Sequence, residues 1–179
     1  MFEGEKTQRV QLPRMNSKNW YAIYTKSRCE KKVHDLMCLR GFEVYLPLVK
    51  TLRQWSDRKK KVEVPLIASY IFVHVNNREY YDIINTPGAV AYVTFEGKAA
   101  KIPEDQIIAM RIAVDSNMQI ELAKENIQAG ERVKVIAGPL KGAEGEFVGE
   151  AHKRNFILNM INIGYTLKIE INASDVIKI

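Results

Sequence analysis

The most informative segment of this chain reads Val133-Lys134-Val135-Ile136-Ala137-Gly138-Pro139-Leu140-Lys141-Gly142-Ala143-Glu144-Gly145-Glu146-Phe147. Apolar and polar residues alternate on both sides of a Gly-Pro-x-x-Gly-x-x-Gly turn, which is the pattern of one strand folded back beside another. The segment contains no set of side chains suited to catalysis. It therefore predicts part of a small β domain that binds a partner.

Short alternating segments follow one another closely in this part of the chain. They lie at 132–136, 145–149, 156–161, 166–171 and 176–177. About fifty residues of closely spaced strands are typical of an SH3-like β-barrel, which we assign to residues 129–179.

The preceding residues alternate between strand and helix patterns. Strands are predicted at 20–25, 42–46, 62–75 and 89–95, with helices after Ser27, after Asn76 and after Pro103. This order predicts a four-stranded antiparallel sheet with helices over residues 19–114, so the fold class of the whole chain is α+β. Residues 1–18 are predicted to be a flexible tail, and residues 115–128 a linker with a weak helical turn near 121–124.

Two local patterns refine this N-terminal domain. Ser27 and Glu30 fit a capping box, in which the Glu30 side chain returns to the backbone at the helix start. Tyr70 and Phe72 are two residues apart on a predicted strand, so they share one face of the sheet. They are the best candidates for an exposed apolar anchor, although core packing is the alternative for each ring taken singly.

Composition narrows the classes of function. The chain has 179 residues, is 46% hydrophobic and contains no run of 18 apolar residues, and its first twenty residues lack a signal-peptide pattern. We therefore expect a cytoplasmic protein with no membrane partner. The two cysteines, Cys29 and Cys38, lie too far apart along one predicted helix to pair, so we expect buried thiols.

The sequence lacks the usual signatures of an enzyme. The loop at 138–142 has no Gly-Lys-Ser/Thr of a phosphate-binding loop, and His34, His74 and His152 stand in no metal-ligand spacing. We expect no metal, no cofactor and no catalytic residue. A carboxylate pair brought together by folding stays open.

The positive charge is concentrated in one segment. The net charge is +6, yet residues 116–179 hold 8 basic and 8 acidic residues, so the excess lies in residues 1–115. Within residues 50–61 there are six basic residues and one acidic residue, which gives +5 on a predicted hairpin. Such a cluster can bind nucleic-acid phosphates, and a solvated hairpin tip is the alternative.

Six short segments share a family pattern in their order and spacing: Trp20-Tyr21-Ala22-Ile23-Tyr24-Thr25-Lys26, Gly41-Phe42-Glu43-Val44-Tyr45-Leu46-Pro47, Tyr70-Ile71-Phe72-Val73, Asn85-Thr86-Pro87-Gly88, Gly138-Pro139-Leu140-Lys141-Gly142 and Ile169-Glu170-Ile171-Asn172. The first four resemble the N-terminal domain of NusG-type transcription elongation factors. The last two look like the KOW domain of the same family. The resemblance covers residues 19–179.

This resemblance implies a function without bond chemistry. In the family the N-terminal domain binds the clamp helices of RNA polymerase through an apolar pocket, which here would contain Tyr24, Tyr70, Phe72, Ile107 and Met110. The resemblance also implies contacts with non-template or upstream DNA. The corresponding residues of this chain would be Lys26, Lys32, Arg53, Arg58, Lys59, Lys60 and Lys61.

Two departures from the family pattern favour a specialised member. Ala68-Ser69-Tyr70 stands where many members have Pro-Gly-Tyr, and Leu140 replaces a common Phe that helps engage ribosomal protein or the termination factor Rho. The chain is most similar to specialised paralogues of the RfaH and UpxY kind, which antiterminate particular long operons. A partner-binding role is implied for Gly138, Pro139, Leu140, Lys141 and Gly142.

Three alternatives follow from the same residues. The leading one is a specialised antitermination factor, acting as a monomer on RNA polymerase. The second is a housekeeping NusG-like factor. The third, from a different class, is a KOW-containing RNA-binding protein of the translation machinery.

Overall fold

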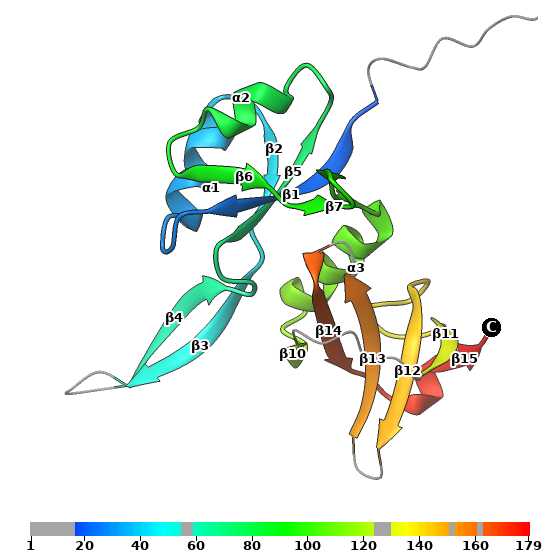
Figure 1. Ribbon diagram of the computed structural model, residues 1–179. Coiled ribbons are helices and arrows are strands. Elements are labelled where there is room, and N and C mark those ends of the chain that lie inside the picture. Colours follow the sequence, from blue (N-terminus) through cyan, green and yellow to red (C-terminus); the bar gives the residue numbers. More distant parts are fainter. Residues whose placement is uncertain (1–16, 55–58, 124–129, 151–152, 161–162) are drawn as a thin grey trace, which may run out of the picture.

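The computed structural model describes residues 17–54, 59–123, 130–150, 153–160 and 163–179. Most of the tail predicted at 1–18 lies outside these residues, as does Arg58. Two domains pack against each other, and a β-hairpin projects away from both (Figure 1).

The N-terminal domain is built on an antiparallel sheet with the strand order β2-β5-β1-β6, and β9 pairs with the other end of β1. The prediction of four strands is therefore corrected to five. The bounds of these strands are β1 (Asn19–Thr25), β2 (Glu43–Tyr45), β5 (Tyr70–Val75), β6 (Ala89–Tyr92) and β9 (Lys101–Ile102).

Three helices cover this sheet on its two faces. They are α1 (Glu30–Leu39), α2 (Tyr80–Ile84) and α3 (Glu104–Asp115). Alternate residues of β1 divide between two cores: Tyr21 packs in a cluster with Val33 of α1, whereas Ala22 packs in a cluster with Ile107 of α3. The alternation of a strand thus fixes α1 on one face of the sheet and α3 on the other.

The predicted strand over 62–75 is divided in the structure. β4 (Lys59–Pro65) pairs with β3 (Leu48–Gln54) in a separate two-stranded hairpin, and β5 begins only at Tyr70. The segment 89–95 is also divided, because β6 ends at Tyr92 and β7 (Thr94–Phe95) pairs with β8 (Lys98–Ala99). Changes of direction at both places separate short strands that periodicity alone joined.

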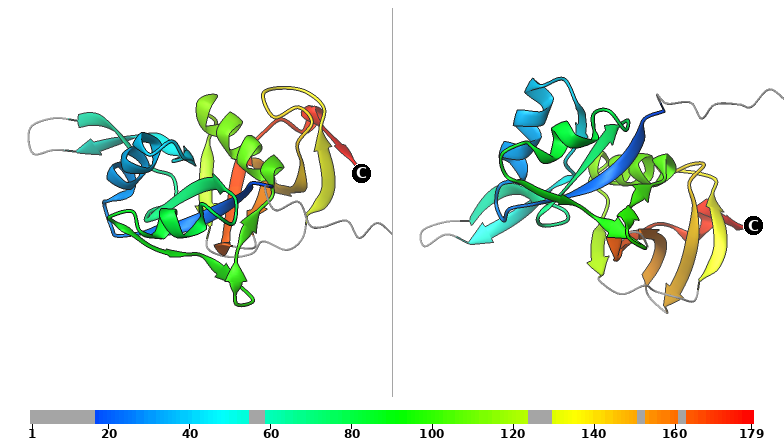
Figure 2. Two further views of the ribbon diagram at one scale, coloured as in Figure 1. Left: turned by 90° about the horizontal axis from the view of Figure 1, so that it is seen from above. Right: turned by 45° about the horizontal axis from the view of Figure 1, so that its top comes forward.

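The C-terminal domain is an antiparallel sheet of six strands in the order β10-β14-β13-β12-β11-β15, shown in Figure 2 beside α3. A short 3-10 helix, η2 (Ala173–Asp175), precedes the last strand. The strands are β10 (Ile120–Ala123), β11 (Glu131–Val135), β12 (Glu144–Glu150), β13 (Lys153–Met160), β14 (Tyr165–Glu170) and β15 (Val176–Lys178).

The first of these strands corrects the expected helical turn near 121–124. Ile120 pairs with Ile169 and Leu122 with Leu167, so β10 forms one end of the sheet. Ile120 and Leu122 also pack against the apolar cluster, and a strand presents both residues on the same side. Part of the predicted linker therefore belongs to the C-terminal domain.

Candidate functional site

Helix α3 lies between the N-terminal sheet and the C-terminal domain (Figures 1 and 2). Ile107 and Met110 of this helix are 1% and 0% exposed. They belong to one apolar cluster with Phe72 of β5 and with Phe156 and Leu167 of the C-terminal domain. The two domains therefore share one continuous core around α3.

Directional contacts fix the way in which the domains meet. The Gln106 Nε2 group on α3 donates a hydrogen bond of 3.0 Å to the Asn159 carbonyl oxygen on β13. A second contact between the domains is made by the rings of Tyr70 on β5 and Tyr165 on β14, which meet edge to face with centroids 5.5 Å apart. Edge-to-face ring pairs and a partly buried hydrogen bond require a defined geometry, so this contact is specific.

The aromatic contact continues to the molecular surface. Tyr24 and Tyr70 are register partners in β1 and β5, and their rings also meet edge to face at 5.5 Å. Tyr24, Tyr70 and Tyr165 thus form a row, which we call the tyrosine row. Tyr24, at the outer end of the row, is 45% exposed. Burial, together with the neighbouring Tyr165 and Tyr24, raises the pKa of Tyr70.

The structure brings the predicted polymerase-binding residues together. Tyr70, Phe72, Ile107 and Met110 lie in or against the same apolar cluster, and Tyr24 contacts Tyr70. The expectation that Phe72 is an exposed anchor is wrong, because its side chain is 0% exposed and its ring stacks near Tyr45 at 6.2 Å. Its place in the central strand β5, under α3, explains this burial.

Sequence reasoning missed a cation of α3, Arg111, that lies near two aromatic rings. The Arg111 guanidinium carbon lies 4.9 Å from the Tyr45 ring centroid and 6.0 Å from that of Trp20. Trp20 also stacks on His74 at 4.9 Å. These residues are far apart in the sequence, and no local pattern predicts their contact.

The Tyr45 hydroxyl is buried without a hydrogen-bond partner in the described part of the chain. Burial is the main cause of a strongly raised Tyr45 pKa, and the negative charge of Asp115 adds to it against the opposing charge of Arg111.

The predicted DNA-binding cations fall in two places. Lys26 and Lys32 are exposed, one before α1 and one in its first turn. Lys59, Lys60 and Lys61 are exposed at the start of β4, and Lys60 lies opposite Arg53 in the register of the hairpin. Both groups therefore present positive charge to solvent. Lys26 and Lys32 lie near the start of α1, and Lys59, Lys60 and Lys61 lie on the projecting hairpin.

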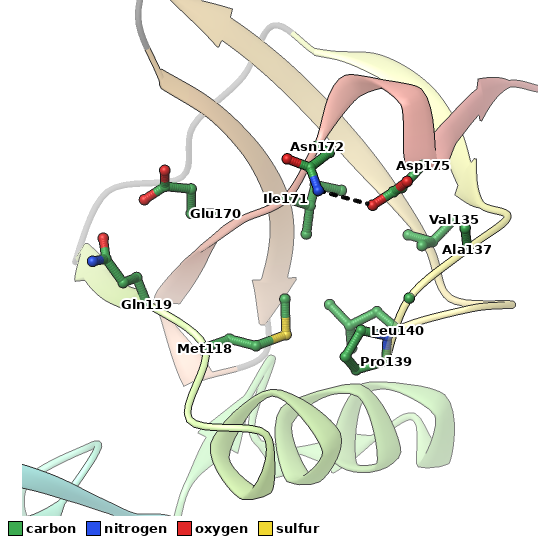
Figure 3. Close-up of a pocket in the computed structure, with 11 residues that line it drawn as sticks. Met118, Gln119, Val135, Ala137, Pro139, Leu140, Glu170, Ile171, Asn172 and Asp175 are labelled. Carbon is green, nitrogen blue, oxygen red and sulfur yellow. Dashed lines mark hydrogen bonds between the residues drawn. The ribbon is translucent and has the colours of Figure 1, made fainter.

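The predicted partner-binding loop has an apolar residue turned inward. Gly138, Pro139, Lys141 and Gly142 are exposed, whereas Leu140 is 1% exposed and packs in the shared cluster. Leu140 is thus not a surface contact in this arrangement. Figure 3 shows it beside a pocket of about 390 Å³, together with Met118, which follows α3.

Candidate metal ligands and thiols were located in the described part of the chain. Among the residues described, no three His, Cys, Asp or Glu side chains gather closely enough to hold a metal ion. Cys29 is half-buried and Cys38 is exposed, so the expectation of two buried thiols is wrong for Cys38. None of the helices described is both long and apolar enough to cross a bilayer.

Comparisons with known proteins find similarity to one family. The family model described as "Transcription termination factor nusG" matches residues 18–111. The transcription termination/antitermination protein NusG of Halalkalibacterium halodurans is 25% identical over 183 residues, covering 90% of this chain and 99% of the relative. NusG of Streptococcus pyogenes serotype M3 is 24% identical, covering 86% and 93%. A structure of Thermotoga maritima NusG, titled for its domain interaction, has a TM-score of 0.48 at 20% identity, covering 91% and 98%.

The buried Tyr45 hydroxyl leads to a prediction about stability. Tyr45→Phe removes a hydroxyl that has no partner, so the free energy of unfolding should stay the same or rise by up to about 1 kcal/mol. Tyr92→Phe is the matched control, because the Tyr92 hydroxyl donates to the Tyr80 carbonyl oxygen at 3.0 Å. The free energy of unfolding of Tyr92→Phe, measured by urea unfolding at neutral pH, should be lower than that of the wild type by about 1 kcal/mol.

The buried Tyr45 hydroxyl also predicts how the stability of the protein depends on pH. Because folding raises the Tyr45 pKa, the unfolded chain releases its phenol proton first, and stability falls as the pH rises above about 10. Tyr45→Phe should flatten this alkaline decline. A steeper decline, or a loss of stability at neutral pH larger than that of Tyr92→Phe, would contradict the assignment.

Proposed function

The chain belongs to the NusG family of transcription termination/antitermination factors, and we propose that it is an elongation and antitermination factor that binds RNA polymerase through the tyrosine row and α3. Proteins of this family are transcription factors and not enzymes, so the chain is not an enzyme. We also propose that it works in the cytoplasm as a monomer.

One observation supports the polymerase-binding face more than any other. Tyr24 is a large ring left 45% exposed at the end of a row whose next member, Tyr70, packs against the apolar cluster of α3. An exposed aromatic residue leading into an apolar surface is the usual centre of a protein interface. The proposed face contains Tyr24, Tyr70, Ile107 and Met110, with Phe72 supporting it from within the sheet.

The C-terminal domain covers most of this face in the structure. Tyr165 contacts Tyr70, and Gln106 is bonded to Asn159, so a polymerase helix cannot reach Ile107 and Met110 while these contacts persist. We infer that polymerase binding exchanges one partner of α3 for another. Only residues 116–119 separate α3 from β10, which keeps the C-terminal domain close to α3.

The proposed mechanism needs only differential affinity. A protein that holds the polymerase clamp closed over nucleic acid favours the elongating state over the paused state, by the difference in its affinity for the two. The exposed cations would add a salt-dependent attraction to DNA, and any that reach base edges would add sequence preference. Lys26 and Lys32 suit non-template DNA, and the β3–β4 hairpin suits upstream DNA.

We propose action on particular operons, as in paralogues of the RfaH and UpxY kind. Leu140 supports this choice, because it is buried and it replaces the common Phe that helps engage ribosomal protein or Rho in the family. A partner of that class would still meet the exposed Pro139 and Lys141.

The polymerase face is tested by removing exposed rings. Tyr24→Ala, and separately Tyr70→Ala, should weaken binding to purified RNA polymerase by at least about tenfold. Tyr81→Ala is the control, because Tyr81 is 74% exposed on α2 and belongs to neither proposed site. Affinities measured by fluorescence anisotropy that are equal for all three variants would refute the face.

The DNA contacts are tested by removing three charges from the hairpin. Lys59→Gln, Lys60→Gln and Lys61→Gln together should weaken binding to a DNA fork and reduce the slope of log affinity against log salt by about 2 to 3. A control with the same change in net charge replaces Lys98, Lys141 and Lys178 by Gln. An unchanged slope in the hairpin variant would mark the hairpin as a solvated loop.

Operon specificity is tested by deleting the gene and sequencing transcripts along their length. A specialised factor should lose the distal transcripts of a few long operons and leave the rest of the genome unchanged. Pausing defects across the genome would instead support a housekeeping factor. Recovery of ribosomes without polymerase in a native purification would support the translation alternative.

A further inference from the structure

Glu30 has a buried carboxylate that no helix cap explains. Its side chain is 6% exposed, and its Oε1 atom accepts a hydrogen bond of 2.7 Å from the Ser69 backbone N–H. The predicted capping box is therefore wrong: Cys29 is the N-cap of α1, and no side chain caps it. Glu30 instead connects the start of α1 to a turn that lies 39 residues away.

Ser69 needs such a partner because its backbone is strained. Its φ angle is 65°, in the left-handed region, which is unfavourable for a residue with a side chain. A second hydrogen bond holds the same residue, since its carbonyl oxygen accepts the Thr25 N–H at 2.8 Å. The turn is thus fixed from both sides, by α1 through Glu30 and by β1 through Thr25.

This turn sets the position of Tyr70, the next residue along the chain. Tyr70 begins β5, and its ring lies between those of Tyr24 and Tyr165 in the tyrosine row. Thr25, which is bonded to the turn, directly follows Tyr24. A shift of the Ser69 peptide would therefore move both tyrosines that the proposed polymerase face presents.

The same carboxylate also lies within a cationic segment, residues 26–32. Lys26 and Arg28 precede Glu30, and Lys32 follows it. Arg28 has a left-handed φ angle of 62°, and the Lys26 N–H donates to the Gly88 carbonyl oxygen at 2.9 Å. The loop from Lys26 to Glu30 is therefore constrained at several points, and Glu30 is the one that joins it to the turn before Tyr70.

We propose that Glu30 is a positioning residue, which holds the tyrosine row and the cationic β1–α1 loop in a fixed relation so that one protein face meets polymerase while the adjoining loop meets DNA. This inference rests on the proposed function. Glu30 itself touches neither partner, because its side chain is buried. Glu30 acts on the position of both regions through its hydrogen bond to Ser69, and it does not cap α1.

Three variants of the full chain separate positioning from general stability. Glu30→Ala should weaken polymerase binding by about tenfold and increase amide hydrogen exchange at Ser69, because it leaves a strained N–H without its charged acceptor. Glu30→Gln keeps an oxygen acceptor of the same shape and should restore most of both. Adding Ser69→Gly to Glu30→Ala should also restore part of the binding, because glycine adopts a left-handed φ without strain.

Glu79→Ala is the matched control. The Glu79 Oε2 atom accepts the Asn76 N–H at 2.9 Å in the turn before α2, so the lost bond has the same chemistry in a different place. This control should lower the melting temperature and leave polymerase affinity within about twofold of the wild type, since α2 lies outside the proposed face.

Several results would overturn the proposal. The first is a polymerase affinity of Glu30→Ala equal to that of the wild type. The second is a loss of polymerase affinity in Glu79→Ala as large as that in Glu30→Ala. The third is a polymerase affinity of Glu30→Gln no higher than that of Glu30→Ala. If the wild-type chain does not bind polymerase at all, the proposed function fails instead. In that case hydrogen exchange at Ser69 still decides whether Glu30 holds the turn, and unchanged exchange in Glu30→Ala would end the positioning role.

Discussion

The rest of the structure depends on the burial of helix α3 against two different partners. Gln106 is bonded to the C-terminal domain, and Ala109 and Met110, three and four residues later on the same side of the helix, are buried. Ile107 and Met110 pack with Phe72 of the sheet in the same cluster. Apolar burial of this extent is favourable for whichever partner covers the helix, and the structure shows one of them in place.

This constraint joins the parts of the molecule that function requires. The alternation of β1 places α3 on one face of the sheet and α1 on the other. Tyr24 and Thr25 end that strand and link the two regions. The turn that precedes Tyr70 is hydrogen-bonded to β1 through Thr25 and to α1 through Glu30.

The sequence predicted the parts of this arrangement that depend on local patterns. Alternation located strands in both domains, and the helix expected after Asn76 is confirmed as α2, which reciprocal hydrogen bonds of 2.9 and 3.1 Å between Asn76 and Glu79 precede. Local patterns did not predict chain reversals or contacts between residues far apart in the sequence. The division of 62–75 depends on the turn at Ser69, and the burial of Phe72 depends on a helix more than thirty residues later.

Similar reasoning explains the errors at Glu30 and at β10. A glutamate three residues after a serine matches a capping box, yet the carboxylate reaches a strained peptide that only the fold brings near. Residues 120–123 have no strong local preference, and they form a strand because β14 offers its edge. The sequence alone also gave no sign of Arg111 over Tyr45, since cation–ring contacts have no sequence period.

The most direct measurement of the central claim is polymerase binding by a chain whose domains are reversibly locked. Cysteines placed at Gln106 and Asn159, in a background with Cys29 and Cys38 replaced by Ser, would be joined by a short reducible cross-linker. The account predicts that the locked chain does not bind RNA polymerase and that reduction restores binding. Equal affinity before and after reduction would show that α3 is not the face that polymerase recognises.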